Sequence, residues 1–299
     1  MGFAGRAHME DHPRVARYDL GFSPCPNDTF MFHGLMSGDV ALPGIELRAH
    51  MADIEALNLR ALSEDPLPFT KLSASALAQL CDRYTVLSSG AALGRGCGPL
   101  VVRRAADEAL SDISALRARK VAIPGQHTTA FLLLRSFYDE ACPGAPLEIE
   151  IMRFEQIMPA VAEGRVDAGL IIHESRFTYA EHGLVELADL GELWERSTGL
   201  PIPLGMICAL RSLPSATIDA LEAGLRRSIE QAFADPQRPK PWIREHAQEM
   251  DDEVCRRHIE LYVNDFSLEL GEEGRAAIDE LLRRGRASGL LPEARDPWR

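Results

Sequence analysis

The sequence predicts an α/β protein of two lobes that close a cleft over one small polar or anionic molecule. Short apolar runs alternate with helical patterns along most of the chain, which is typical of βαβ units and a largely parallel sheet. A glycine-rich stretch over residues 90–98 divides these elements into two groups. Hydrophobic residues form 46% of the 299 residues, which is enough for a sizeable core in one large domain or in two lobes.

The first group of predicted elements forms one lobe. A strand over 18–22 leads into a rigid loop with two prolines over 23–28, and a helix begins near Thr29. The elements that follow are strands over 45–50 and 69–72 and helices over 54–62 and 75–83.

The glycine-rich stretch contains four glycines and is followed by Pro99 and a strand over 100–103. We interpret it as a hinge or an interlobe strand, because glycine adopts backbone angles that other residues avoid. A phosphate-binding loop is the alternative. The stretch lacks the Gly-Lys-Ser/Thr ending of such a loop and the spacing of a dinucleotide fingerprint, which disfavours that alternative.

The second group of elements forms a smaller α/β lobe. Its predicted strands are 121–124, 149–154 and 168–172, and its predicted helices are 114–119, 129–140 and 156–163. A strand over 204–210 then leads back, and helices over 218–233, 242–246, 252–263 and 274–288 close the chain. If the chain returns to the first lobe, two strands cross the hinge, which is the plan of a type 2 periplasmic-binding-protein-like fold. The predicted lobes are 18–102 with 206–299, and 103–205, after an N-terminal extension, 1–17, that is expected to be mobile.

Charge and cysteine content exclude several kinds of partner. The chain has 45 Asp and Glu against 32 Lys and Arg, a formal net charge of -13, and no dense basic stripe. Nucleic acids and anionic membranes are therefore not expected as partners, although local donors can still bind a small anion. Six scattered cysteines without a zinc spacing predict a reducing compartment and no structural metal. Because no signal-peptide h-region or membrane-length apolar run is present, we expect a cytoplasmic protein.

A histidine follows the predicted strand 168–172. His173 lies just past the carboxyl end of this apolar run, which is where ligands bind in open α/β sheets. Histidine suits base chemistry near neutral pH, and the neighbouring Glu174 or Arg176 could tune or orient it. The alternative is a histidine that only satisfies hydrogen bonds at a strand end.

Two segments at predicted helix starts carry hydroxyl groups. Thr128 and Thr129 follow a strand, so their hydroxyls and nearby amides can converge on an anion such as a carboxylate. Lys71 and Ser73 repeat this arrangement in the first lobe and add a cation. Ordinary N-capping and a solvated lysine are the alternatives.

The loop after the first strand is the third candidate segment. Two prolines restrict its backbone around Cys25. No base stands near Cys25 in the sequence, which disfavours the thiol as a nucleophile. The small polar residues of the segment are better candidates for cleft or ligand groups, with turn formation as their alternative; they are Ser23, Asn27, Asp28 and Thr29.

Taken in order, these segments resemble the 1,4-dihydroxy-6-naphthoate synthase family of the futalosine route to menaquinone. The resemblance runs from about residue 18 to residue 289, and the stretch 1–17 lies outside it. It rests on Ser-Pro-Cys-Pro-Asn-Asp-Thr-Phe at 23–30, Thr-Lys-Leu-Ser at 70–73, Ser-Gly-Ala-Ala-Leu-Gly at 89–94, His-Thr-Thr-Ala at 127–130, His-Glu-Ser-Arg-Phe-Thr-Tyr at 173–179 and His-Ile-Glu-Leu-Tyr-Val-Asn at 258–264.

The resemblance implies a lyase that converts cyclic dehypoxanthinyl futalosine, a small carboxylated substrate, to 1,4-dihydroxy-6-naphthoate. It implies His173 as proton acceptor and no cofactor or metal. It further implies two substrate-binding segments, Lys71, Leu72 and Ser73 in the first lobe and Thr128 and Thr129 in the second. Because these segments come from different lobes, we expect catalysis to require closure of the cleft.

Two other functions fit the same fold. One is a non-catalytic cytosolic module that binds a small anion, because a fold alone does not decide function. The other is the chorismate dehydratase-like enzyme of the same pathway, although the segment 173–179 favours the naphthoate enzyme. The sequence makes no prediction of the oligomeric state.

Overall fold

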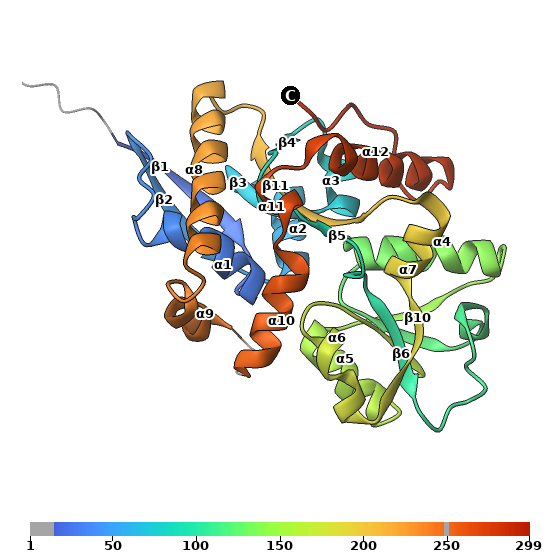
Figure 1. Ribbon diagram of the computed structural model, residues 1–299. Coiled ribbons are helices and arrows are strands. Elements are labelled where there is room, and N and C mark those ends of the chain that lie inside the picture. Colours follow the sequence, from blue (N-terminus) through green and yellow to red (C-terminus); the bar gives the residue numbers. More distant parts are fainter. Residues whose placement is uncertain (1–14, 248–250) are drawn as a thin grey trace, which may run out of the picture.

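The computed structural model describes residues 15–247 and 251–299 and contains two β-sheets (Figure 1). The first sheet has the strand order β2-β1-β3-β11-β4, and β5 also pairs with β11. The second has the order β10-β6-β9-β7-β8. Strands of the first sheet are β1 (Ala16–Phe22), β2 (Ile45–Met51), β3 (Phe69–Ser73), β4 (Tyr84–Val86), β5 (Ala92–Gly94) and β11 (Ile202–Leu210). Strands of the second are β6 (Leu100–Arg104), β7 (Lys120–Ile123), β8 (Glu148–Ile151), β9 (Ala168–Ile171) and β10 (Leu184–Asp189).

Helices surround each sheet, so that the chain forms two halves. The half built on the first sheet carries α1 (Pro26–Met36), α2 (Ile54–Leu62), α3 (Ala74–Leu80), α8 (Ser215–Ala234), α9 (Lys240–His246), α10 (Asp252–Tyr262), α11 (Asp265–Leu268) and α12 (Gly271–Ala287). The other half carries η1 (Ile113–Leu116), α4 (Thr129–Ala141), α5 (Phe154–Ala162), α6 (Ser175–Thr178), η2 (Tyr179–His182) and α7 (Leu190–Thr198). Figure 1 shows α10 running beside the second half, next to α6.

The prediction of a largely parallel sheet is wrong, because both sheets are mixed. β1 pairs in parallel with β2 and β3, but β11 runs antiparallel to β3, β4 and β5. β6 likewise runs antiparallel to β9 and β10. The reason is the path of the chain: β6 and β11 each enter their sheet from the other half. Each therefore starts at the edge where the parallel strands end.

The predicted lobe boundaries at 102 and 205 fall inside β6 and β11, each of which lies wholly in one sheet. The chain passes between the sheets over 95–99 and again over 190–201, which includes α7. Of the predicted extension 1–17, residues 1–14 lie outside the described residues. Residues 16 and 17 are not part of an extension, because they pair with Ile45 and Glu46 of β2.

Several predicted elements differ in their bounds. α1 begins at Pro26 rather than near Thr29, because a proline at the first helical position has its backbone angle already set. The strand predicted over 149–154 ends at Ile151, and Phe154 instead begins α5. The helix predicted over 114–119 is only the short turn η1. The prediction missed β4, β5, β10, α6, α7 and α11.

The apolar core is continuous across the two halves. One buried cluster includes Leu77 and Met206 of the first half together with Leu133, Leu170 and Trp194 of the second. A second cluster packs α1 and α8 against the first sheet. The two halves therefore meet through buried side chains behind the cleft.

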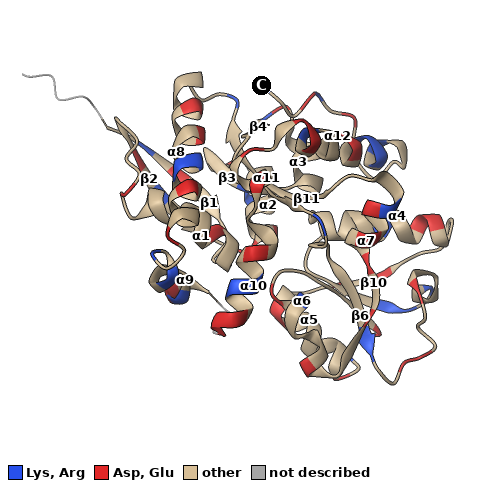
Figure 2. Cartoon of the chain, in the orientation of Figure 1, with Lys and Arg blue, Asp and Glu red and all other residues tan. Residues whose placement is uncertain are grey.

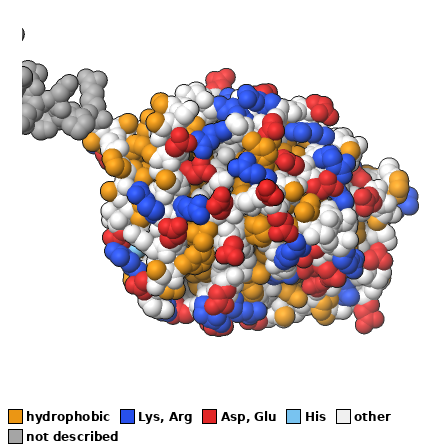
Figure 3. Space-filling model, turned by 45° about the horizontal axis from the view of Figure 1, so that its top comes forward, with side chains coloured by type: hydrophobic (Ala, Val, Ile, Leu, Met, Phe, Trp, Pro, Cys, Tyr) orange, Lys and Arg blue, Asp and Glu red, His pale blue; other side chains and the backbone are white. Residues whose placement is uncertain are grey.

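The surface carries both signs of charge. Figure 2 shows acidic and basic residues interspersed along the helices of both halves, and the face drawn in Figure 3 mixes them with apolar side chains. No helix within the described ranges has the length and apolar character needed to cross a membrane.

Candidate active site between the two halves

A cavity lies where the ends of the two sheets meet, and both halves line it. The first half contributes Asn27, Lys71 and Ser73, and the second contributes Thr128, Thr129 and His173. All six were predicted as site residues. The cavity is also lined by residues that the prediction missed: Ile54, Ala92, Cys97, Pro99, Ala130, Ile172, Leu204, Gly205, His258 and Tyr262.

His173 has an unusual backbone conformation. Its φ is 59°, in the left-handed region that residues other than glycine rarely adopt. Its ring stacks on Phe154, with the centroids 5.1 Å apart and the planes at 29°. Such strain costs about 1–3 kcal/mol and persists where surrounding contacts over-determine the conformation, as they do at active sites. The side chain is therefore held in one orientation at the end of β9.

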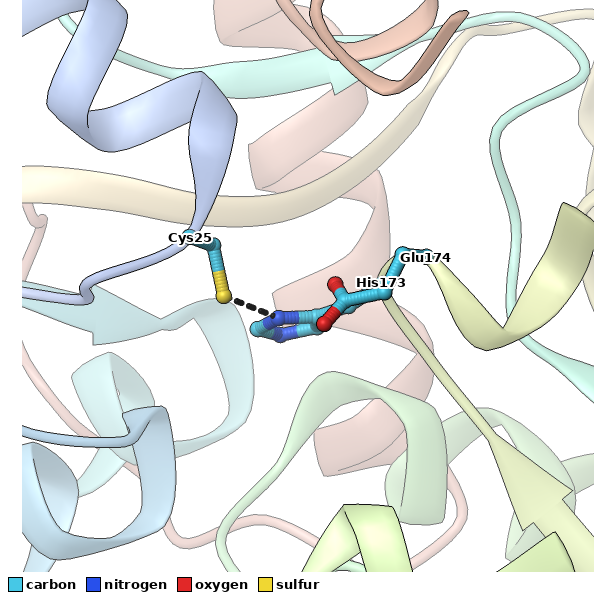
Figure 4. A group of neighbouring side chains, drawn as sticks. All are labelled: Cys25, His173 and Glu174. Atoms are coloured by element: carbon cyan, nitrogen blue, oxygen red, sulfur yellow. Dashed lines mark hydrogen bonds between the residues drawn. The ribbon is translucent and has the colours of Figure 1, made fainter. Parts of the chain in front are cut away.

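Three side chains with proton or metal-binding groups converge at His173 (Figure 4). Sγ of Cys25, at the N-terminus of α1, lies 2.7 Å from Nδ1 of His173, although 148 residues separate them. The carboxylate of Glu174 lies close to the same ring, and one potential metal-ligand atom from each of the three residues falls within 4.8 Å of the others. The sulfur–nitrogen separation fits a hydrogen bond. Two ligands of one zinc ion would lie about 3.5 Å apart, given the usual bond lengths and tetrahedral geometry.

Burial keeps both members of the Cys25–His173 pair neutral. It lowers the pKa of His173 to about 4, and the positive charge of Lys71 acts in the same direction. Burial also raises the pKa of the Cys25 thiol well above its ordinary value, with Glu174 as the next cause. A neutral imidazole can accept a proton, whereas a neutral buried thiol is a poor nucleophile. Of the two side chains, the neutral imidazole of His173 is therefore the one that can accept a proton.

The same pKa shift predicts how stability depends on pH. Because the folded-state pKa of His173, about 4, lies below the unfolded value of 6.5, the unfolded chain binds more protons between these values. The free energy of unfolding should therefore fall as the pH is lowered from about 6.5 to about 4. His258, whose pKa is also lowered, acts in the same direction. Urea unfolding at a series of pH values measures this, and His173→Asn should make the fall less steep. An equal slope in the variant would contradict the shift at His173.

A buried ion pair lies beside the histidine. The ammonium group of Lys71 contacts Oδ1 of Asp28, and their side chains are 8% and 0% exposed. Asp28 also accepts hydrogen bonds from the backbone N and Oγ of Ser23, at 2.9 and 2.7 Å, and from Nδ2 of Asn27, at 3.0 Å. The alternative of a solvated lysine is therefore wrong. The ammonium group of Lys71 is bound to a buried carboxylate of the protein itself.

The threonine hydroxyls are also engaged within the protein. Oγ1 of Thr128 caps α4 by accepting from the N–H of Phe131. Oγ1 of Thr129 donates to the carbonyl of Leu204 over 2.7 Å and accepts from the N–H of Ala74 over 2.9 Å. The hydroxyl of Thr129 thus joins α4 to the first half. The α4 terminus still presents backbone N–H groups, because the first turn of a helix has no intrahelical acceptors for them.

A second set of contacts joins the halves near α2. Oε1 of Glu55 lies 2.8 Å from Nδ1 of His127 and accepts from the His127 backbone N–H over 3.1 Å. The fully buried Asn58 donates to Oγ of Ser73 and to the carbonyl of His127. The prediction missed both residues of α2, because a glutamate and an asparagine on a helix give no sign in the sequence of meeting a loop about seventy residues away.

Three predicted site residues have structural contacts instead. The side chain of Leu72 is 0% exposed within the apolar core. The hydroxyl of Thr29 donates to the carbonyls of Cys25 and Pro26 within the first turn of α1. Arg176 does not orient His173, because its guanidinium binds Asp189 at the end of β10 and the carbonyl of Gly98.

The chain is similar to known proteins over most of its length. A family model described as menaquinone biosynthesis matches residues 18–287. The chain belongs to the menaquinone biosynthesis family. Two curated members are named 1,4-dihydroxy-6-naphtoate synthase. That from Thermus thermophilus is 50% identical over 278 residues, 93% of this chain and 97% of its own length. That from Streptomyces coelicolor is 48% identical over 274 residues, 91% of this chain and 94% of its own length. The family predicted from the ordered motifs is confirmed.

Solved structures confirm the predicted fold of this family member. A protein from Archaeoglobus fulgidus has 34% sequence identity and a TM-score of 0.83, and the match covers 92% of this chain and 98% of that one. The alkanesulfonate-binding protein from Xanthomonas axonopodis pv. citri has 14% identity and a TM-score of 0.70, over 94% and 96% of the two chains. The second likeness shows the periplasmic-binding-protein fold alone.

Proposed function

We propose that this chain is a lyase that converts cyclic dehypoxanthinyl futalosine to 1,4-dihydroxy-6-naphthoate, with His173 as the proton acceptor. The names of its relatives support this product. The observation that carries the role of His173 is the position of its neutral ring in the wall of the cavity, on a residue with a constrained backbone. When Nδ1 donates to Sγ of Cys25, Nε2 is the nitrogen whose lone pair is left for a substrate.

The chemistry suits these residues. The neutral ring of His173 removes a proton from a carbon that a neighbouring carbonyl activates. The sugar-derived ring then opens, carbon–carbon cleavage releases a three-carbon fragment, and aromatisation of the bicycle favours completion. Because both halves line the cavity, a bound substrate would be shielded from water that would protonate the intermediate wrongly. Such a sequence of steps transfers no hydride or electron.

We place the substrate carboxylate at the N-terminus of α4. Thr129 and Ala130 line the cavity there, and the first-turn N–H groups and helix dipole favour an anion. Ser73 lies across the cavity, and its hydroxyl can still donate because it accepts from Asn58. Lys71 contributes its charge at a distance, since its ammonium group is bound to Asp28. We infer no nucleic-acid or membrane partner. No disulfide joins cysteines within the described residues, which favours a reducing compartment, and we propose that this compartment is the cytoplasm.

Product analysis tests this function directly. The purified protein should convert cyclic dehypoxanthinyl futalosine to 1,4-dihydroxy-6-naphthoate in buffer without added metal or nicotinamide, as followed by liquid chromatography with mass detection. Chorismate serves as the control substrate and should remain unchanged. Dehydration of chorismate would replace the proposal with the sibling activity. Binding of either compound without turnover would replace it with a binding function.

A further inference from the structure

His258 has a ring nitrogen that no contact of the site uses. The residue lies on α10, is 1% exposed and lines the cavity beside His173, with the ring centroids 6.3 Å apart. Its ring also packs on Tyr262, at a centroid distance of 4.6 Å. These contacts hold the ring in place at the cavity wall.

A chain of hydrogen bonds determines which nitrogen of His258 carries the proton. Lys71 and Nδ2 of Asn27 both approach Oδ1 of Asp28. Because a carboxylate only accepts, the amide nitrogen of Asn27 faces Asp28 and its oxygen faces His258. That oxygen lies 2.9 Å from Nε2 of His258. Nε2 therefore donates, and the neutral ring has its lone pair on Nδ1.

Nδ1 of His258 is buried and has no hydrogen-bond partner within residues 15–247 and 251–299. Oε2 of Glu174 lies 3.9 Å away, beyond hydrogen-bond reach. Burial, with His173 and Lys71 as further causes, lowers the pKa of His258 well below its ordinary value, so the ring stays neutral. A buried acceptor without a donor is unfavourable, and a ligand that brings a donor removes this penalty.

We propose that Nδ1 of His258 accepts a hydrogen bond from a hydroxyl group of the bound ligand, and so selects hydroxylated bicyclic carboxylates over unhydroxylated ones. This inference rests on the proposed function, whose substrate and product both carry hydroxyl groups. It gives the two histidines separate tasks. His173 takes a proton from carbon, and His258 holds a hydroxyl group of the same ligand in place.

Two variants separate this role from a structural one. His258→Gln places an amide nitrogen near the position of Nε2, so the bond to Asn27 remains while the acceptor at Nδ1 is removed. His258→Asn places its amide oxygen near the position of Nδ1, so an acceptor remains there while the contact with Asn27 is lost. If His258 has only a structural role, His258→Asn should lower the stability and His258→Gln should change little. If Nδ1 binds the ligand, His258→Gln should lower the affinity for the hydroxylated ligand.

Titration calorimetry without oxygen measures the affinity of each protein for 1,4-dihydroxy-6-naphthoate and for 2-naphthoate, the same bicyclic carboxylate without hydroxyls. The unsubstituted protein should prefer the dihydroxy compound by about tenfold, the worth of a buried hydrogen bond. His258→Gln should lose this preference and bind 2-naphthoate as before. His258→Asn should retain the preference and unfold at a lower temperature.

A preference that survives in His258→Gln would overturn the inference and leave the proposed function standing. If His258→Gln does not fold, His258→Asn decides the question, and loss of the preference in that variant would overturn the inference. If the unsubstituted protein binds neither compound, the proposed function fails first and the inference falls with it.

Discussion

Replacement of His173 by asparagine should lower kcat by a factor of about 10²–10⁴, which is the rate enhancement that a positioned general base usually contributes. Asparagine is the suitable substitute, because it tolerates the left-handed backbone that His173 adopts at φ 59°. The variant should therefore fold and bind 1,4-dihydroxy-6-naphthoate, while it barely turns over cyclic dehypoxanthinyl futalosine. Steady-state kinetics and titration calorimetry on the same preparation measure both properties.

The matched control is His182→Asn, which changes an exposed histidine of η2 in the same half. It should leave both kcat and the free energy of unfolding unchanged. A folded His173→Asn protein with near-normal turnover would remove the assignment of the base. A variant that loses chiefly its folding stability would show that His173 only supports the structure.

Replacement of Lys71 by methionine should reduce the free energy of unfolding by about 3–5 kcal/mol, because it leaves the carboxylate of Asp28 buried without its cation. The hydrogen bonds from Ser23 and Asn27 to Asp28 place the loss toward the lower end of this range. Urea unfolding at neutral pH measures the change.

The double variant Asp28→Asn with Lys71→Met should recover much of this loss, since it removes both charges together. Arg17→Met is the matched control on an exposed pair, because Arg17 and Glu46 are 79% and 55% exposed. It should cost less than about 1 kcal/mol. If Lys71→Met reduced the free energy of unfolding as little as Arg17→Met does, the buried pair would not be needed to neutralise Asp28.

Much of the site could be predicted because its residues follow regular elements. His173 follows an apolar strand and Thr128 precedes a helix, and both positions show in the local alternation of apolar and polar residues. The mixed sheets could not be predicted in this way. The direction of β6 and β11 depends on which half each strand comes from, and local periodicity has the same form in parallel and antiparallel strands.

By itself, the sequence determined the family, the approximate positions of most elements and the residues that stand at the ends of strands. Only the tertiary structure decided what those residues contact. Cys25 meets His173 across 148 residues, and Asn27 meets His258 across 231. The physical reason is that periodicity, capping and turn chemistry act over a few residues, whereas these contacts exist only once two sheets have formed and their ends face one cavity. The tautomer of His258 is set in this way by its distant partner Asn27, whose amide nitrogen faces Asp28.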